Sequence, residues 1–439
     1  MFRKLVKAII PKDMFRTIEP TGHLLEAMMW QVLYGWPARG LNVIGVTGTN
    51  GKTTTCFMVH EMLNKAGYKV GLMSTVGYGV GDNIRPQMTH MTTSGTRVTL
   101  QRIRALRRQG MKWLVLETTS HALAQNRVWG IPYTVAAMTN LTHEHLAYHG
   151  TFERYRDAKV KLFRLVAANR DGLRTGVVNA DDPSAPYFAA AVPKVLTYST
   201  KAGRADLVAK NVRSTAAGSR YELRHAGRTI EMTVNLPGGF NVENSLAAAG
   251  VGLAIGLTDE QIAQGVAAVT TVEGRMTRID MGQDFSAIVD YAHSPDSFEK
   301  LFADLKPKVA GRLIVVFGSQ GVTGDKGKRA IQGRLAGEQA DLVVVTEEDD
   351  RGEDGEAIMR EIAGGAEKAG KVIGKDLWLV HDRPEAMRFA VGLAKKGDAV
   401  LFLGKGHEKT IERAAGSEEP WDEAGEVRKA LRARVGKGK

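Results

Sequence analysis

From residue 41 onward, short runs of apolar, mostly β-branched residues alternate with longer stretches in which apolar residues recur every three or four positions. The short runs predict strands, the longer stretches predict amphipathic helices, and their alternation is typical of parallel α/β sheets. The expected strands are Asn42–Val46, Trp113–Leu116, Val135–Thr139, Gly176–Asn179, Arg312–Phe317, Leu342–Thr346 and Ala399–Leu403. The expected helices are Lys52–Lys65, Thr99–Arg108, Thr151–Ala167, Asn241–Ala254 and Arg383–Ala394.

One segment departs from this pattern. Ala205–Val234 alternates apolar and polar residues, which predicts an antiparallel excursion of the sheet. A new series of strands and helices begins after Thr271–Arg275, so we place a domain boundary there. The pattern predicts a short helical extension over residues 1–40, a central domain over 41–272 and a second domain over 273–439.

The composition excludes several classes of protein. With 43% hydrophobic and 25% charged residues, the chain does not resemble a disordered, collagen-like or integral membrane protein. Its one cysteine, Cys56, excludes a disulfide scaffold and a cysteine-ligated zinc site, and it suits a reducing cytosol. The net charge of +12 is compatible with phosphorylated substrates, an anionic membrane or nucleic acid. The basic runs Arg97–Lys112 and Arg428–Lys439 lack an aromatic stacking platform, so we expect no nucleic-acid partner.

The first ten residues do not form a secretory signal, because Lys7 interrupts the apolar run and no small-residue cleavage site follows. Apolar residues alternate there with Arg3, Lys4 and Lys7. This pattern fits either a short helix packed on the next domain, which is favoured, or a basic amphipathic helix in peripheral contact with a membrane.

The segment Leu41–Thr55 predicts a strand, a glycine-rich turn and the start of a helix. Gly48 and Gly51 allow backbone N–H groups to point at phosphate, Lys52 adds a cation, and the hydroxyl of Thr53 suits Mg²⁺. Val46 stands where the usual phosphate-loop motif has its first glycine. The match is therefore to the variant Gly48-Thr-Asn-Gly-Lys-Thr53, and it predicts nucleotide binding through residues 48–54.

Further motifs accompany this loop. They are Glu117-Thr-Thr-Ser-His121, Thr139-Asn-Leu-Thr-His-Glu-His-Leu-Ala-Tyr-His-Gly150, Asp157-Ala-Lys159, Asn241-Val-Glu-Asn244, Gly274-Arg275, Asp290-Tyr-Ala-His-Ser-Pro295, Asp325-Lys-Gly-Lys-Arg329 and Gly404-Lys-Gly-His-Glu408. In this combination the chain resembles the Mur ligase family from about residue 41 onward, and within it the MurE type. That type adds the third amino acid to UDP-N-acetylmuramoyl-dipeptide. The resemblance implies an α/β fold: a central P-loop ATPase domain with a mostly parallel sheet, and a C-terminal Rossmann-like domain that brings in the amino acid.

The metal-binding candidates follow from chemistry and from the resemblance together. Glu117 ends a predicted strand one strand after the phosphate loop, where a carboxylate can hold phosphate-bound Mg²⁺. The cluster His143, Glu144, His145 and His149 lacks the His-Glu-x-x-His spacing of a zinc site. The resemblance implies that His145 helps to bind a second Mg²⁺, while His143 and His149 remain structural.

Lys159 matches the family lysine that CO₂ converts to N6-carboxylysine, an anionic oxygen ligand. Carbamylation needs a neutral amine, which burial near cations would favour. The resemblance also implies that Asn140, Asn244, Arg275, Asp290 and His293 surround the nucleotide. By itself, Asn244 could equally be a hydrogen bonder inside a helix, and Asp290 a cap at a strand end.

The implied reaction has two steps. The γ-phosphoryl group of ATP passes to a substrate carboxylate, and the amine of the incoming amino acid then attacks the acyl phosphate, which releases phosphate and forms an amide. Lys52, Arg275 and two Mg²⁺ ions would stabilise the charge, and domain closure could deliver Arg275.

Only about 40 residues precede the strand of the phosphate loop, fewer than the ~50 that a domain normally needs. Members of the family carry a full N-terminal domain there, which holds the uridine diphosphate. We therefore expect either that the central domain alone holds the acceptor, through Thr92, Thr93, Ser120 and Arg127, or that the acceptor is linked to lipid.

The amino-acid pocket departs from the family as well. Members that add diaminopimelate carry Asp-Asn-Pro-Arg, whereas this chain reads Glu348-Asp-Asp-Arg351, and Gly324 replaces a second arginine. Arg351 could bind a carboxylate in bidentate fashion. The acidic loop favours a cationic side chain such as lysine or ornithine, unless it merely faces solvent. The candidates for binding the amino acid are Asp349, Arg351, Gly404 and Glu408.

Two other interpretations compete. A related ligase of the folylpolyglutamate or cyanophycin type would act on another carboxylate acceptor. A degenerate nucleotide-binding scaffold would have lost Lys52, Glu117, His145 or Lys159, all of which are present. From the family alone we expect a cytoplasmic monomer with small-molecule substrates.

Overall fold

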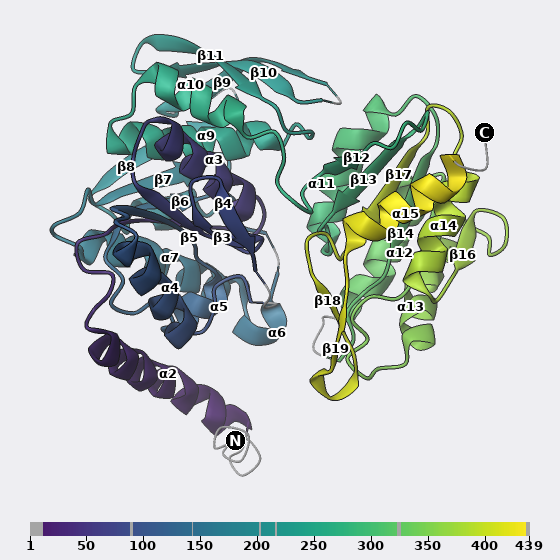
Figure 1. Ribbon diagram of the computed structural model, residues 1–439, viewed down its shortest axis with the longest axis horizontal. Helices are drawn as coiled ribbons and strands as arrows, with labels where there is room; N and C mark the ends of the chain where they lie inside the picture. Colours follow the sequence, from purple (N-terminus) through teal and green to yellow (C-terminus); the bar gives the residue numbers. More distant parts are fainter. Residues whose placement is uncertain are drawn as a thin grey trace.

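The computed structural model describes residues 12–87, 91–142, 144–201, 203–215, 217–322 and 326–435, without the side chains of residues 12–19, 146 and 147. Two sheets, each flanked by helices, lie side by side, and the long N-terminal helix α2 (Lys12–Tyr34) lies at the outer edge of the first one (Figure 1). His143 and the first eleven residues, on which some sequence predictions fall, lie outside the described residues.

The first sheet has eleven strands in the order β11-β10-β9-β8-β7-β6-β1-β5-β2-β3-β4. The strands from β9 to β2 in this order pair in parallel, whereas β9, β10 and β11 pair antiparallel to one another, as do β2, β3 and β4. Their bounds are β1 Asn42–Thr47, β2 Val70–Met73, β3 Gly77–Val80, β4 Asn83–Pro86, β5 Trp113–Glu117, β6 Tyr133–Met138, β7 Thr175–Asn179, β8 Lys194–Ser199, β9 Leu207–Ser214, β10 Ser219–His225 and β11 Arg228–Val234.

Helices cover both faces of this sheet. One apolar core joins it to α3 (Lys52–Lys65), α9 (Asn241–Ile255) and α10 (Asp259–Ala268). A second core, on the opposite face, joins it to α4 (Thr96–Arg108) and α7 (Phe152–Ala168). The short helices are α5 (Ser120–Ala124), α6 (Leu146–His149) and α8 (Ala185–Ala189). Because both faces are covered, the central strands read as continuous apolar runs.

The second sheet has the order β12-β13-β17-β14-β15-β16, and only β12 pairs antiparallel. Its strands are β12 Thr277–Ile279, β13 Ser286–Asp290, β14 Leu313–Phe317, β15 Leu342–Val345, β16 Leu377–Leu379 and β17 Ala399–Leu403. One face packs on α11 (Pro295–Leu305), α12 (Gly327–Gln339) and α13 (Gly355–Lys368). The other packs on α14 (Arg383–Leu393) and α15 (Glu423–Val435), and a hairpin of β18 (Thr410–Glu412) and β19 (Glu418–Pro420) follows β17.

The predicted α/β fold class is confirmed, and every expected strand and helix is present. The largest differences in their bounds are at α4, which begins at Thr96 rather than Thr99, and β6, which begins at Tyr133 rather than Val135. The predicted antiparallel excursion is β9–β11. The strands β3 and β16 were missed because they are too short to show a period, and the longer strands β8 and β13 were not predicted either. Among the described residues, no helix is long and apolar enough to cross a bilayer.

Candidate nucleotide and ligase site

The phosphate loop connects β1 to α3 and depends on two glycines. Gly51, at the N-cap of α3, has φ +83°, and a Cβ there would lie 2.0 Å from Oδ1 of Asn244. Gly48 has φ +146°, and a Cβ there would lie 1.9 Å from Oγ1 of Thr139. Both positions therefore require glycine, because neighbouring side chains occupy the space that a Cβ would need. The loop passes close to polar groups from β6 and α9.

The chain after β6 holds the loop in place. The N–H of Thr49 donates to the carbonyl of Asn140 at 2.7 Å, and the N–H of Asn50 donates to Oδ1 of Asn140 at 2.9 Å. The hydroxyl of Thr139 donates to the carbonyl of Asn50 at 2.6 Å. Nζ of Lys52 donates to the carbonyl of Thr49 at 2.7 Å, so its charge lies over the loop. A loop held at this many points is pre-organised for phosphate.

A hydroxyl and a carboxylate meet beside the loop. Glu117, the last residue of β5, is 1% exposed and accepts hydrogen bonds from Oγ1 of Thr53 at 3.0 Å and from the N–H of Thr75 at 2.8 Å. Strands β1 and β5 are neighbours in the sheet, and this pairing brings Glu117 to the phosphate loop. Mg²⁺ is usually bound by one or two carboxylates and by substrate phosphates, with water filling the remaining positions. Thr53 and Glu117 fit that donor set.

Lys159, on α7, lies beneath the same loop. Its side chain is 2% exposed, and Nζ donates to the carbonyl of Gly48 at 2.5 Å. Desolvation, followed by the charge of Lys52, lowers the pKa of the Lys159 amine well below its usual value, although Glu144 and Glu117 oppose the shift. The neutral amine that carbamylation needs is therefore favoured at this position.

Three imidazoles form a cluster next to Lys159. The ring of His121 lies 4.7 Å from that of His145 and 5.4 Å from that of His149, and Nε2 of His149 is 3.1 Å from the hydroxyl of Ser120. Desolvation and the cations Lys159 and Lys52 lower the pKa of His145 to about 3. His145 is therefore neutral, which is the form that binds metals. Within the described residues, no group of three or more His, Cys, Asp or Glu side chains is arranged to hold a metal ion.

Residues of the second sheet and its loops approach the phosphate loop from the other side. A guanidinium nitrogen of Arg275 lies 3.2 Å from Oγ1 of Thr53, and its Nε is buried without a partner within the described residues. Asp290, at the end of β13, accepts hydrogen bonds from the N–H groups of Met276 at 2.7 Å and Ala292 at 2.8 Å. Burial raises the pKa of Asp290, and the charge of Arg275 opposes that rise. Arg275 is thus positioned to face a phosphate group.

The two halves meet around one pocket of about 900 Å³. Of the residues predicted from sequence, it is lined by Thr49, Asn50, Gly51, Lys52, Thr53, Thr54, Thr92, Thr93, Glu117, Arg127, Asn140, His145, Asn244, Arg275, Asp290, His293, Arg351 and Glu408. Gly48, Ser120, Lys159, Asp349 and Gly404 do not line it. Gly48 and Lys159 lie directly behind the loop, and Ser120 is buried against His149.

The candidate acceptor residues surround Glu117. The hydroxyl of Thr93 donates to the carbonyl of Glu117 at 2.9 Å, and the hydroxyls of Thr75 and Thr92 are 3.1 Å apart. Arg127 donates to the carbonyl of Thr93 at 3.1 Å. Thr92, Thr93 and Arg127 therefore form one wall of the pocket beside the candidate metal site.

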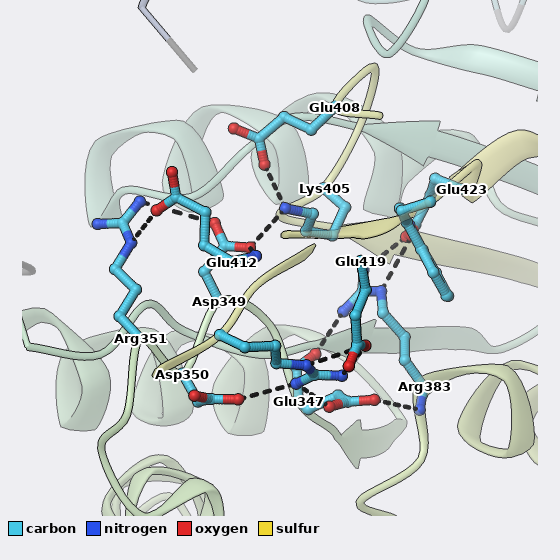
Figure 2. A network of polar contacts seen from close by, with 12 residues as sticks. Glu347, Asp349, Asp350, Arg351, Arg383, Lys405, Glu408, Glu412, Glu419 and Glu423 are labelled. Atoms are coloured by element: carbon cyan, nitrogen blue, oxygen red, sulfur yellow. Dashed lines mark hydrogen bonds and ion pairs between the residues drawn. The ribbon is translucent and has the colours of Figure 1, made fainter. Parts of the chain in front are cut away.

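The acidic loop after β15 does not face solvent. Figure 2 shows its side chains turned toward the loop after β17 and the hairpin β18–β19. Asp349 is fully buried and accepts a hydrogen bond from Nζ of Lys405 at 2.7 Å, and Lys405 also pairs with Glu408 at 2.6 Å. Nε of Arg351 pairs with Glu412 at 2.5 Å. The interpretation of this loop as a solvated charge run is thus wrong, because buried cations from other segments neutralise it.

The carboxyl group of Glu348 lies so close to Gly404 that it leaves no room for a side chain at position 404. Gly404 has φ +102°, and a Cβ there would lie 2.4 Å from Oε2 of Glu348. Oε1 of Glu348 is buried without a partner within the described residues. Burial, strengthened by Asp349, raises the pKa of Glu348 to about 7. Glu348 does not line the pocket, so its carboxyl group belongs to the buried support of the acidic loop.

Several contributors were missed at the level of sequence. Thr75 follows β2 and donates its N–H to Glu117, and Tyr155 is 3.0 Å from the hydroxyl of Thr49. Glu144 lies 3.8 Å from Nε2 of His293, across the boundary between the two halves. Arg413 pairs with Glu347 at 2.5 Å and with Asp350 at 2.8 Å. Thr75 follows β2, a strand that the sequence analysis did not predict, and no local pattern distinguishes Arg413 from a surface arginine.

Family models match both halves of the chain. Residues 46–252 match the Mur ligase middle domain, and residues 274–406 match the Mur ligase glutamate ligase domain. A UDP-N-acetylmuramyl-tripeptide synthetase from Roseiflexus sp. (strain RS-1) is 42% identical over 430 residues, which span 95% of this chain and 84% of that protein. The chain belongs to the Mur ligase family.

Two further comparisons support the assignment to the Mur ligase family. A UDP-N-acetylmuramoyl-L-alanyl-D-glutamate--2,6-diaminopimelate ligase from Geobacillus thermodenitrificans (strain NG80-2) is 38% identical over 396 residues, covering 89% of this chain and 79% of that protein. A solved structure titled as that type of ligase superposes with a TM-score of 0.63 at 32% identity, over 91% of this chain and 80% of its own. The resemblance read from the motifs is confirmed, including its MurE type.

Proposed function

We propose that this Mur ligase is an ATP-dependent amide ligase that adds an amino acid, diaminopimelate or a basic one such as lysine, to a muramoyl-dipeptide precursor of peptidoglycan. One observation carries the proposal: one pocket is lined by the phosphate loop, by Glu117 and Arg275, and by Arg351 and Glu408. Arg351 and Glu408 belong to the network of charged side chains in Figure 2, which we call the acidic cluster. Nucleotide, acceptor and amino acid can therefore meet in one cavity. The names of the relatives point to the same reaction.

In this proposal the γ-phosphoryl group moves from ATP to an acceptor carboxylate, and the bond to ADP breaks. The neutral amine of the amino acid then forms the amide bond, phosphate leaves, and the amine loses a proton. Lys52 and Arg275 flank Thr53, and their charges would stabilise the transferring group. Thr53 and Glu117 would hold one Mg²⁺ and His145 a second, and the metal would supply further charge neutralisation. Asn140, Asn244, Asp290 and His293 would hold the rest of the nucleotide.

We propose that CO₂ carbamylates Lys159, whose buried amine has a pKa well below its usual value and so supports this chemistry. The modification forms an N–C bond to CO₂ and releases a proton from the amine. Protein incubated with ¹³C-labelled bicarbonate should give a carbamate signal by nuclear magnetic resonance, and Lys159→Arg should lack it. An unchanged signal in Lys159→Arg would assign the carbamate to another amine.

The amino acid would lie where the pocket meets the acidic cluster, close to Asp349, Arg351, Gly404 and Glu408. Glu408 lines the pocket, and the acid-rich surroundings support a cationic side chain, although Lys405 and Arg413 already neutralise part of this negative charge. Arg351 is held by Glu412, so a substrate carboxylate would have to compete for it.

The test is phosphate release from MgATP with UDP-N-acetylmuramoyl-dipeptide and, separately, lysine, ornithine or diaminopimelate. Turnover with one amino acid would establish the reaction and its specificity. Thr93→Val and Arg127→Ala should raise the KM for the acceptor and leave the KM for ATP unchanged if they line the acceptor site. Absence of turnover, in protein that still binds ATP, would favour a lipid-linked acceptor or one of the folylpolyglutamate or cyanophycin type.

We further propose that residues 1–40, 41–272 and 273–439 are separate units. The change of sheet between β11 and β12 and the matched ranges 46–252 and 274–406 support this division. A cytoplasmic monomer remains part of the proposal, and light scattering tests the oligomeric state.

A further inference from the structure

The phosphate loop contacts the second half of the molecule through the side chain of Asn50. Nδ2 of Asn50 donates a hydrogen bond to Oδ2 of Asp296 at 2.6 Å, across 246 residues of sequence. Asp296 belongs to α11, whose apolar residues pack on the second sheet. Asn50 lines the pocket, whereas Asp296 does not. This carboxylate therefore joins the loop to the second half without forming part of the pocket wall.

The backbone of Asn50 is held by the first half. Its N–H donates to Oδ1 of Asn140 at 2.9 Å, and its carbonyl accepts hydrogen bonds from the hydroxyl of Thr139 at 2.6 Å and from Nδ2 of Asn140 at 3.2 Å. These bonds fix the course of the loop, so Asp296 is not needed to shape it. What the bond to Asp296 adds is a defined position of α11 relative to the loop.

The start of α11 holds Asp296 firmly. Ser294 caps the helix by accepting a hydrogen bond from the N–H of Ser297 at 3.3 Å, and Pro295 occupies the first helical position. Nζ of Lys300, one turn further along, pairs with Oδ2 of Asp296 at 3.1 Å. A negative charge in the first turn also interacts favourably with the helix dipole. The carboxylate thus offers Asn50 a strong acceptor in a defined place.

The far end of α11 contacts the first half as well. Oδ1 of Asp304 accepts a hydrogen bond from the N–H of Gly239 at 2.6 Å, in the turn that leads into α9. A Cβ at Gly239 would lie 2.9 Å from the same oxygen, so the two segments are in close contact. Because α9 packs in a core of the first sheet, α11 is attached to the first half near both of its ends.

The segment that leads into α11 also supports Arg275. The N–H of Tyr291 donates to the carbonyl of Gly274 at 2.9 Å, and the guanidinium group of Arg275 lies 4.8 Å from the ring centre of Tyr291. Arg275 in turn lies 3.2 Å from Oγ1 of Thr53, three residues after Asn50 in the loop. A displacement of α11 would therefore displace the surroundings of Arg275 relative to the loop.

We propose that Asp296 is a positioning residue for the ligase reaction. By holding Asn50 it fixes the second half against the phosphate loop, and so it keeps Arg275 beside Thr53. A misplacement of about 1 Å at a reacting centre can lower a rate by about 100-fold, so a single contact that sets this position affects turnover. The effect on turnover rests on the proposed function, whereas the effect on the arrangement of the two halves does not.

Energy transfer between two dyes measures the arrangement of the halves without any turnover. Lys65→Cys on α3 and Lys429→Cys on α15 would carry the dyes, because the native side chains are 57% and 73% exposed and the natural Cys56 is buried. With MgATP present, Asp296→Ala should lower about tenfold the ratio of molecules at the parent protein's dye separation to molecules at other separations. The lost hydrogen bond to a carboxylate stabilises that one arrangement only.

Phosphate release from the full chain gives the second measurement. Asp296→Ala should lower kcat about tenfold, because Arg275 lies beside Thr53 less often, and should change the KM for ATP less than about twofold, because the first half still holds the loop. Asp296→Asn should stay within about threefold of the parent kcat, since its amide oxygen can accept the bond from Asn50. Asn50→Ala/Asp296→Ala should give the same dye separations as Asn50→Ala alone, because both changes remove one bond.

Glu356 provides a matched control. It is the second residue of α13, as Asp296 is the second residue of α11, but it is exposed to solvent. Glu356→Ala should keep the dye separations, the kcat and the KM for ATP of the parent protein. Both alanine variants lose a similar interaction with a helix N-terminus, so their melting temperatures should be similar.

Several results would overturn the proposal. Unchanged dye separations in Asp296→Ala, or an equal change in Glu356→Ala, would show that Asp296 does not hold the halves together. Changed separations with an unchanged kcat would show that this contact does not position Arg275. A raised KM for ATP with an unchanged kcat would assign Asp296 to nucleotide binding instead. If no amino acid supports turnover, the proposed function fails, while the dye separations still decide whether Asp296 fixes the two halves.

Discussion

Gly51 offers a sharp test of how the phosphate loop is built, because the chain contains a matched control. Gly51 and Gly67 share φ +83°. A Cβ at Gly51 would lie 2.0 Å from Oδ1 of Asn244, whereas a Cβ at Gly67 would meet nothing within 4 Å. Alanine at either position therefore carries the same backbone strain, and only alanine at Gly51 also collides with a neighbour.

The magnitudes follow from these contacts. Left-handed backbone costs an alanine about 1–2 kcal/mol, which should be the whole effect of Gly67→Ala. In Gly51→Ala the amide of Asn244 must also move, which breaks its 2.8 Å hydrogen bond to Oδ1 of Asn241 and costs about 1 kcal/mol more. The displaced loop should bind ATP at least about tenfold more weakly, since a tenfold change corresponds to about 1.4 kcal/mol.

Urea unfolding of both variants gives the free energies of unfolding, and titration with MgATP gives the dissociation constants. Gly67→Ala should bind ATP like the unmodified protein. Asn244→Ala in the Gly51→Ala background should restore much of the stability difference, because it removes the colliding amide. Equal stabilities and equal ATP affinities for the two glycine variants would refute the reasoning. The collision with Asn244 would then affect neither the free energy of unfolding nor the binding of ATP.

Three further predictions concern the acidic cluster. Because the pKa of Glu348 is raised from its usual 4.5 to about 7, the folded protein retains a proton that the unfolded chain releases. Its stability should fall by about 3 kcal/mol as pH rises through that range, and Glu348→Gln should flatten the profile measured by urea unfolding between pH 4 and about pH 8. Glu423→Leu should destabilise the fold by about 3–5 kcal/mol because it leaves Arg383 buried without its ion-pair partner, whereas Lys429→Ala, at an exposed pair, should change stability by less than about 0.5 kcal/mol. Gly404→Ala should lower the melting temperature, and adding Glu348→Ala should recover part of the loss, since the strain of the left-handed backbone remains. A double variant no more stable than the single one would contradict the contact between them.

Much of the fold could be predicted from the local pattern of apolar residues, because burial dictates that pattern. Central strands such as β1 and β14 are buried on both faces, so they appear in the sequence as continuous apolar runs. The phosphate loop was equally predictable from sequence, because its glycines, lysine and threonine lie within six consecutive residues. The strands β3 and β4 and the β18–β19 hairpin left no such signal, since their pairing partners rather than their composition hold them in place.

The sequence by itself predicted a phosphate loop, a carboxylate one strand away and, through the resemblance to the family, Lys159 as a candidate for carbamylation. Only the tertiary structure decided which groups meet. Arg275 reaches Thr53 across 222 residues, and Asn244 fills the space that Gly51 leaves open. The sequence left open whether the loop from Glu347 to Asp350 faces solvent, whereas the structure buries Glu347, Glu348 and Asp349 and pairs the loop with Lys405 and Arg413 from a distant segment. Such contacts escape sequence patterns because burial and long-range pairing, rather than the order of residues, set the free energy of a charged side chain.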